Sequence, residues 1–268
     1  MTEPAAYFVR RSDRTFQPTP HTRGAWSQTE QHISPLNGLA VHALEQALDP
    51  GDGKVVGRLS FDILGPVSLD ELTVDVEVLR PGRTVELVEA VVVSRGRRVL
   101  RCSAWRLARV DTAEVAGGGA MPLPAPADVP VWDMTSVWPG AYIASLDTRR
   151  TADSRPGRAT AWVSSRLALV EDEPVSALAT FVSLVDTANG VAVRHPPEQW
   201  LFPNVDLTIH LHRQPVAGPV GLDTTVVFGP DGQGLTSSVL SDVDGPVGTA
   251  AQVLTLRPRV SPSPSSAR

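Results

Sequence analysis

The clearest pattern of hydrophobic and polar positions lies in residues 34–48, where apolar side chains recur every three or four residues. The repeating positions are Leu36, Leu39, Ala40, Ala43, Leu44 and Ala47. This spacing places them on one stripe of an α-helix. Ser34 can cap the start of the helix, Pro35 suits its first turn, and Asp49-Pro50-Gly51 ends it. We therefore predict a helix with one buried face.

Four strand-like runs follow this helix. They cover residues 55–64, 72–79, 84–93 and 99–107, and the second alternates strictly between apolar and polar positions. Turn-forming segments such as Pro81-Gly82 join them. A parallel βαβ arrangement would need a helix between successive strands, so the pattern favours an α+β fold with an antiparallel sheet.

Residues 111–131 interrupt this pattern with consecutive glycines and closely spaced prolines, a composition typical of a linker. We predict an N-terminal domain over residues 1–110 and a C-terminal domain over residues 132–258, joined by this linker. The Ser/Pro-rich residues 259–268 are predicted to form a disordered tail.

The C-terminal part repeats the order of the N-terminal part. A strand-like run at residues 159–170 precedes a helix that starts near Pro174 and ends at Asn189-Gly190. Four further strands are predicted at residues 205–213, 222–228, 235–241 and 247–256.

The two halves can be overlaid on each other. The overlay puts Pro35 on Pro174, Leu72 on Leu207 and Val99 on Val247. We interpret this as a duplicated fold packed as a pseudo-dimer. Two unrelated α+β domains could share such an order by chance, but duplication accounts for it better.

Charge and composition exclude several classes of function. The net charge of −5 argues against nucleic acid as the main partner, because binding phosphates needs concentrated Lys and Arg. No apolar stretch reaches the ~20 residues of a membrane span, and residues 1–11 do not resemble a signal peptide. Cys102 is the only cysteine, which rules out an intrachain disulfide. We expect a cytoplasmic protein that binds neither membranes nor nucleic acid.

Several segments resemble the type II acyl-CoA thioesterases. Residues 202–213 are similar to the family's Asp-bearing strand, and residues 232–252 are similar to its last two strands. In the N-terminal half, Pro35-Leu36-Asn37-Gly38 and Leu79-Arg80-Pro81-Gly82 resemble the family's first domain. The resemblance covers almost the whole chain, and it depends on order, spacing and duplication more than on any single motif.

The resemblance implies a double hotdog, in which each of two tandem units lays a long helix across a curled antiparallel sheet. Acyl-CoA would lie between the two units and be hydrolysed to free acid and CoA. The family uses no metal and no redox cofactor, so none is expected. Acyl-CoA, or another acyl thioester, is the expected partner, and a homo-oligomer is left open.

The family's catalytic set is an Asp, a Gln and a hydroxyl residue, which together hold a water. The resemblance puts the Asp on Asp206 and the Gln on Gln252. The hydroxyl position falls on Val226 or Val227, so Thr224, on the same strand face as Val226, is the candidate. A carboxylate can accept the proton of a water while an amide and a hydroxyl orient it.

Gly38 and Asn37 are the candidates for binding the oxyanion of the substrate, since the start of a helix offers free N–H groups. Gly38 could equally serve only close packing between helix and sheet. The overlay pairs Asp206 with Glu71 and Gln252 with Ala104, which predicts one active site and not two. In the plainer alternatives, Asp206 only ends a strand and Gln252 faces outward.

Other polar and aromatic residues have weaker claims. His210 and His212 share a strand face and could bind a metal, but without a third nearby ligand a structural or phosphate-binding role is favoured. His42 and Glu45 are expected to form a solvated pair on the polar side of the helix.

Tryptophans and arginines add two further candidates. Trp105, Trp162 and Trp200 could line an acyl tunnel, although core packing is their default role. Arg97, Arg98 and Arg101 could meet the phosphates of CoA or simply be solvated.

The leading hypothesis is therefore an acyl-CoA thioesterase. The alternatives are a non-catalytic hotdog that binds an acyl ligand, a structural double hotdog, and a hydratase, since hotdog hydratases use an Asp and a His.

Overall fold

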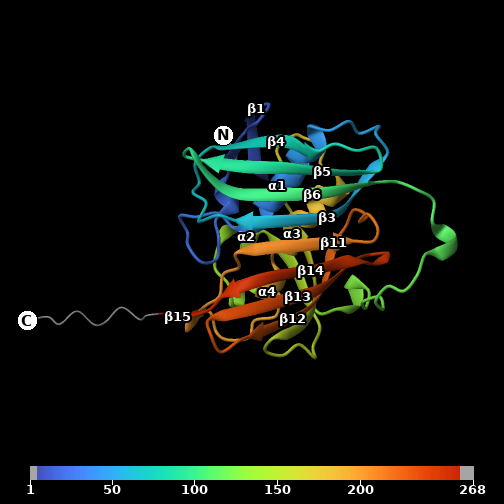
Figure 1. Ribbon diagram of the computed structural model, residues 1–268. Helices are drawn as coiled ribbons and strands as arrows, with labels where there is room; N and C mark the ends of the chain where they lie inside the picture. Colours follow the sequence, from blue (N-terminus) through green and yellow to red (C-terminus); the bar gives the residue numbers. More distant parts are fainter. Residues whose placement is uncertain (1–4, 260–268) are drawn as a thin grey trace, which may run out of the picture.

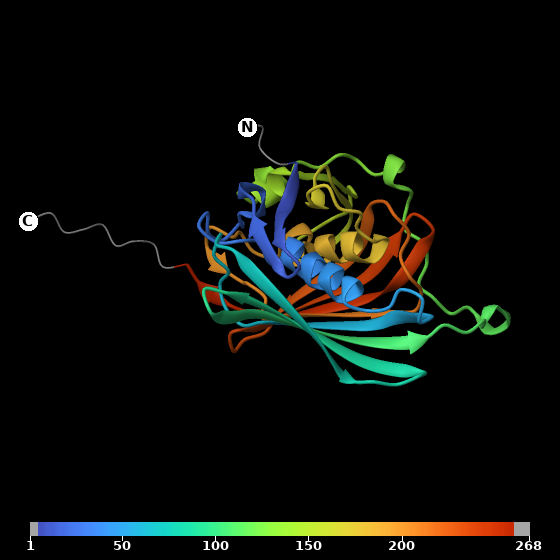
Figure 2. The ribbon, with the colours of Figure 1, turned by 90° about the horizontal axis from the view of Figure 1, so that it is seen from above.

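The computed structural model describes residues 5–259. One large curved sheet of 13 strands wraps two helices that lie side by side on its inner face (Figures 1 and 2). None of the helices in these residues is long and apolar enough to cross a membrane.

The N-terminal half forms the predicted helix, α1 (Ile33–Gln46), and the four predicted strands. These strands are β3 (Lys54–Ile63), β4 (Leu72–Arg80), β5 (Val85–Ser94) and β6 (Arg97–Ala108). In β5 every second residue is buried, which turns one face of the strand toward α1 and leaves the other near solvent. A hairpin that the sequence pattern missed, β1 (Ala6–Ser12) and β2 (Thr15–Pro18), extends the sheet beyond β4.

The C-terminal half repeats this order. Its sheet strands are β7 (Leu146–Arg150), β8 (Arg158–Ser165), β9 (Ala168–Val170), β11 (Asp206–Leu211), β12 (Val220–Phe228), β13 (Gln233–Asp242) and β14 (Gly245–Thr255). Its helices are α2 (Ala141–Ala144), α3 (Ala177–Val185) and α4 (Ala188–Val191). β10 (Trp200–Leu201) and β15 (Arg257–Pro258) form a separate small sheet. Short 3-10 helices are η1 (Pro20–Thr22), η2 (Ala113–Val115), η3 (Pro126–Asp128) and η4 (Met134–Ser136).

The two halves meet at the antiparallel pair β3–β11, so that their sheets join edge to edge. The strand order is β7-β8-β12-β13-β14-β11-β3-β6-β5-β4-β2-β1-β9. Outward from the central pair, β14, β13 and β12 on one side match β6, β5 and β4 on the other. This arrangement confirms the α+β double hotdog expected from the sequence.

The pairing of residues between β3 and β11 corrects part of the sequence overlay of the two halves. Ser60 lies opposite Thr208, and these two residues differ by the same 148 positions as Val99 and Val247 of the overlay, so we place the approximate two-fold axis at this pair. The counterpart of Asp206 is therefore Arg58 and not Glu71, because the matched strands are β3 and β11, not β4 and β11. Ser103 pairs with Ser60 and Ala251 with Thr208, so Ala104 does match Gln252.

Helices α1 and α3 pack closely against each other. A Cβ atom on Gly38 would lie 2.5 Å from the Cβ of Ser183 and 2.8 Å from the carbonyl oxygen of Ala179. Ser176, which caps the start of α3, donates to Glu45 near the end of α1, at 2.6 Å. The helices therefore run antiparallel, and the start of α1 lies beside the end of α3.

The segment predicted as a linker leaves the sheet after β6 as an extended arm (Figure 1). It returns to the C-terminal half, where Trp162 Nε1 donates to the carbonyl oxygen of Pro124 at 2.9 Å. The domain boundaries at residues 110 and 132 stay predictions, and β1 pairs across them with β9 in parallel. The predicted disordered tail lies, except for Arg259, outside the described residues.

Candidate active site

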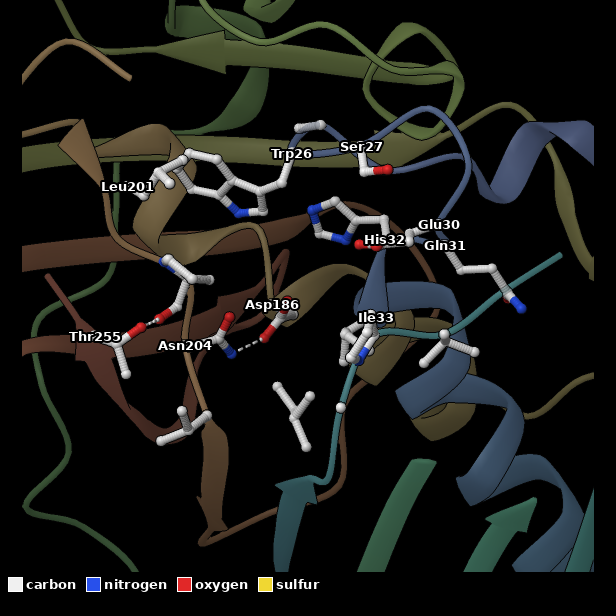
Figure 3. Close-up of a pocket in the computed structure, with 18 of the residues that line it drawn as sticks. Trp26, Ser27, Glu30, Gln31, His32, Ile33, Asp186, Leu201, Asn204 and Thr255 are labelled. Carbon is white, nitrogen blue, oxygen red and sulfur yellow. Dashed lines mark hydrogen bonds between the residues drawn. The ribbon is translucent and has the colours of Figure 1, made fainter. Parts of the chain in front are cut away.

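A cavity of about 530 Å³ opens between the start of α1 and the end of α3 (Figure 3). Its walls come from both halves of the chain. The polar and aromatic lining residues used below are Trp26, His32, Asp186, Asn204 and Arg257. The junction of the two hotdogs thus forms a partly open space of ligand size.

Asp186 is the first residue after α3, and its side chain is buried. Its Oδ1 accepts hydrogen bonds from Asn204 Nδ2 at 2.7 Å and from Gln252 Nε2 at 2.8 Å. Its Oδ2 has no hydrogen-bond partner among residues 5–259 and is not sealed from the cavity. One carboxylate oxygen is held in place, and the other is free for a ligand or water.

The pKa of Asp186 is raised to about 7. Burial is the main cause, because it disfavours the charged carboxylate, and the nearby charge of Asp206 raises the pKa further. The hydrogen bonds from Asn204 and Gln252 act in the opposite direction. A carboxyl that titrates near neutral pH can both accept and return a proton, which suits general acid–base catalysis.

Gln252 lies on β14 with its side chain turned inward and buried. This excludes the outward-facing alternative. Its Oε1 has no partner among the described residues, and neither has the buried hydroxyl of Thr236, which lies directly opposite on β13. These two buried oxygens lie beside the carboxylate cluster without a hydrogen-bond partner in residues 5–259.

Asp206, the sequence candidate for the carboxylate, has a different contact. Its Oδ1 accepts the backbone N–H of Val253 at 2.6 Å, and its carbonyl oxygen accepts from Asn204. The side chain therefore takes the place of a backbone acceptor where the pairing of β11 and β14 ends. The carboxylate that contacts Gln252 is Asp186, because the end of α3 brings this residue to the inner face of β14.

Thr224, the hydroxyl candidate, is fully buried on β12 and bonds to Ser238 at 2.8 Å. It does not line the cavity. The side chain that binds Asp186 together with Gln252 is the amide of Asn204 and not a hydroxyl, and the hydroxyl of Thr236 lies opposite Gln252 on the neighbouring strand.

Asn37 and Gly38, the oxyanion candidates, lie one turn into α1. Asn37 is fully buried, and neither its amide nitrogen nor its amide oxygen has a partner within residues 5–259. It lies outside the cavity lining, one turn beyond Ile33, which does line it. Gly38 faces α3, so its contacts support the packing role, here between two helices.

The start of α1 borders the cavity and carries one backbone donor that is not used within the described residues. The residue that caps the helix is His32 and not Ser34, since His32 Nδ1 accepts the N–H of Ser34 at 3.1 Å. Pro35 has no N–H, and the N–H of Ile33 makes no hydrogen bond to the described residues. The Ile33 N–H is therefore free at the positive end of the helix dipole.

The aromatic wall of the cavity is Trp26. It packs edge-on against Trp138 and Phe202, with ring centroids 4.9 and 5.2 Å apart. None of the three tryptophans proposed from the sequence lines this space. Trp162, for example, is buried against the linker.

The expectation for His42 was wrong. His42 is buried, and its Nε2 lies 3.0 Å from Glu173 Oε2, not in a solvated pair with Glu45. Glu173 also accepts from Arg10, and this bond is the main reason why its pKa is lowered to about 2. His210 is exposed, and no three metal-binding side chains come together in the described part of the chain.

A basic surface adjoins the cavity. A second hollow of about 400 Å³ shares Glu30, Gly65 and Pro66 with it and reaches the hairpin between β5 and β6. Arg97 and Arg98 on this hairpin are exposed and form no ion pair with the described residues. A bound molecule could therefore extend from the cavity to free guanidinium groups.

Sequence reasoning missed Asp186, although a signal was present. It is the only charged residue between Pro174 and Val193, at the end of an otherwise apolar helix. A lone carboxylate that folding must bury is a candidate for a functional group, because burial of a charge is costly unless it is used or paired.

The curved sheet and the paired helices on its inner face define a double-hotdog protein. The chain belongs to the acyl-CoA thioesterase family. Its residues 22–107 match the acyl-CoA thioesterase N-terminal domain, and residues 122–256 match the acyl-CoA thioesterase C-terminal domain.

Solved structures show the same fold at low sequence identity. The acyl-CoA thioesterase II TesB2 of Mycobacterium marinum is 17% identical, with a TM-score of 0.67, and the match covers 94% of this chain and 96% of that one. The tesB protein of Mycobacterium avium subs paratuberculosis is 16% identical, with a TM-score of 0.66 and the same coverage.

A conserved hot dog fold protein of unknown function from Alicyclobacillus acidocaldarius is 15% identical, with a TM-score of 0.72. That match covers 96% of this chain and 98% of that one. No curated protein sequence matches the chain.

Proposed function

We propose that this protein hydrolyses acyl-CoA to a free acid and CoA, with Asp186 as the general base. The observation that carries the proposal is the state of that carboxylate. Its Oδ1 is held by Asn204 and Gln252, its Oδ2 is open to the cavity, and its pKa is about 7.

The reaction would proceed in two proton transfers. A water bound at Asp186 Oδ2 gives its proton to the carboxylate as its oxygen attacks the thioester carbonyl carbon. The C–S bond then breaks, and the leaving thiolate takes the proton back from the Asp186 carboxylic acid. The products are the carboxylic acid and the CoA thiol, and Asp186 is regenerated.

Asn204 and Gln252 would orient this centre. Asn204 Nδ2 donates one hydrogen to Asp186 Oδ1 and the other to the carbonyl oxygen of Asp206. Its Oδ1 accepts no hydrogen bond from the described residues, so it can accept the second hydrogen of the water. Gln252 fixes the carboxylate from the sheet side. The amide oxygen of Asn204 can thus orient the water, which is the role that the resemblance assigns to a hydroxyl.

The start of α1 would stabilise the oxyanion. The free N–H of Ile33 and the helix dipole offer positive potential where negative charge develops on the carbonyl oxygen. This donor lies on one wall of the cavity, and Asp186 lies on another.

CoA would lie along the second hollow. Its phosphates would reach Arg97 and Arg98, which have no acidic partner among residues 5–259, and Arg257 lines the cavity itself. Phosphates and guanidinium groups form strong charge-assisted hydrogen bonds, so this surface favours a phosphorylated thioester over an uncharged one.

A non-catalytic binder of acyl-CoA is the second candidate, and the amide of Asn204 in place of a hydroxyl is the observation that favours it. A panel of acyl-CoAs of increasing chain length, assayed with a thiol reagent, separates the two. We expect release of free thiol. Thermal stabilisation by acyl-CoA without release of thiol would support the binder, and neither response would overturn both.

A further inference from the structure

The side chain of His32, which caps α1, has a second ring nitrogen that bonds to none of the described residues. His32 Nδ1 accepts the N–H of Ser34, so this nitrogen must carry a lone pair and the ring proton must reside on Nε2. Figure 3 shows the ring directed from the start of α1 toward the space between Trp26 and Asp186. Nε2–H makes no hydrogen bond to the described residues and is not sealed off.

The surroundings keep this imidazole neutral. Burial lowers its pKa to about 3, and the positive end of the α1 dipole also disfavours a charged ring. Its ring packs on Tyr142, with centroids 4.3 Å apart. His32 is therefore held as a rigid neutral donor at any pH at which Asp186 is ionised.

We propose that His32 donates its Nε2–H to the thioester carbonyl oxygen, alongside the Ile33 N–H, and so acts as a catalytic electrophile. This inference rests on the proposed hydrolysis of a thioester in the same cavity. The hydrogen bond shortens as negative charge grows on the oxygen, and the proton stays on Nε2 throughout.

The same geometry argues against a hydratase in which the histidine is the base, because a base needs a free lone pair. The lone pair of His32 is occupied by Ser34, and the other nitrogen carries the proton. The Asp and His in this cavity are arranged as base and donor, with Asp186 as the base.

The variant His32→Asn separates capping from donation. Asn is a good N-cap and can still accept the N–H of Ser34, but its short side chain has no donor that reaches the cavity. We expect kcat/KM to fall by about 10²- to 10³-fold, as for loss of one oxyanion donor, while the midpoint of the pH–rate profile stays near 7. A variant with wild-type kcat/KM would overturn the inference.

Binding of two non-hydrolysable CoA derivatives provides a test that does not depend on turnover. The first is the ketone analogue, in which CH₂ replaces the thioester sulfur, and the second is the S-alkyl thioether, which has no carbonyl. We expect His32→Asn to weaken the ketone about 10-fold and to leave the thioether unchanged. Equal effects on both, or on neither, would overturn the inference even if the wild type hydrolyses thioesters. If the wild type shows no turnover, but His32→Asn still binds the ketone more weakly and the thioether equally well, only the proposed function is refuted.

Discussion

Asp186 and Gln252 are joined by a hydrogen bond of 2.8 Å between the residue that follows α3 and the inner face of β14. The bond ties a helix end to the sheet beneath it. It also sets the direction of the carboxylate, because Asn204 binds the same oxygen from a third segment. Three segments of the chain therefore determine where a single proton acceptor points.

Replacement of Asp186 by Asn should abolish most of the activity. The Asn side chain keeps the shape of the carboxylate and an oxygen for Asn204 and Gln252, but it cannot accept the proton of water. We expect kcat to fall by about 10²- to 10⁴-fold, measured as thiol release from the best acyl-CoA. Binding of the thioether analogue should change little.

Asp206→Asn is the matched control, and it decides between the two carboxylates. Its new amide oxygen can still accept the N–H of Val253, so the fold should be retained. Because the charge of Asp206 raises the pKa of Asp186, its removal should move the midpoint of the pH–rate profile below 7 without abolishing turnover. If Asp206→Asn instead loses 10²-fold or more and Asp186→Asn stays active, Asp206 is the base.

The pH dependence of stability should show the cost of the buried acid. The pKa of Asp186 rises from 3.8 to about 7 on folding, so its favourable contribution is complete below pH 4 and is lost as the pH rises through 7. At pH 8 we expect the variant Asp186→Asn to be more stable than the wild type, with a free energy of unfolding that is about 2–4 kcal/mol higher. Chemical denaturation at pH 4 and pH 8 measures this, and an equal difference at both values would contradict the assigned pKa.

The arginines of the β5–β6 hairpin should matter for CoA but not for the acyl group. In the double variant Arg97→Ala, Arg98→Ala we expect KM for acyl-CoA to rise about 5- to 10-fold, since each exposed ion contact is worth up to ~1 kcal/mol. KM for the matching N-acetylcysteamine thioester, which lacks phosphates, should stay the same.

Arg83→Ala provides the control for that experiment. Arg83 is equally exposed but lies in the turn between β4 and β5, at the opposite end of these strands. It should leave both KM values unchanged. The effect of the hairpin pair should also shrink at high salt, where surface charges are screened; a salt-independent effect would point to damage to the fold.

Gly38→Ala tests whether this glycine packs or catalyses. The added Cβ would meet Ser183 and the carbonyl of Ala179, so we expect a loss of about 1–3 kcal/mol in unfolding free energy, although Ala favours a helix over Gly. Activity per folded molecule should be unchanged. Ser183→Gly removes one of the two clashes, and the double variant should recover part of the loss, as a double-mutant cycle would show.

Much of the fold followed from local patterns. The 3.6-residue stripe of α1 and the alternation in β4 predicted these elements within a few residues of their observed bounds. The repeated order predicted the duplication. The β1–β2 hairpin was missed because β1 carries its apolar residues in one run without alternation and β2 is only four residues long.

The candidate site could be predicted only in part. Gln252 was found because a polar residue interrupts an apolar strand. Asp206 was chosen for the carboxylate because it interrupts another, and the sequence does not show that its side chain meets the backbone of β14. Asp186 ends a helix, so its neighbours depend on where that helix crosses the sheet.

The sequence by itself determined the order of helices and strands, the duplication and the family, because each depends on local periodicity or on order along the chain. Only the tertiary structure decided which carboxylate contacts Gln252, and that His32 and not Ser34 caps α1. The contact between Asp186 and Gln252 joins residues far apart in the chain and depends on where the end of α3 meets the sheet, about which side-chain spacing along the chain carries no information. The cap is a local contact between His32 and Ser34, and the sequence does not show which of these two side chains folds back onto the start of the helix.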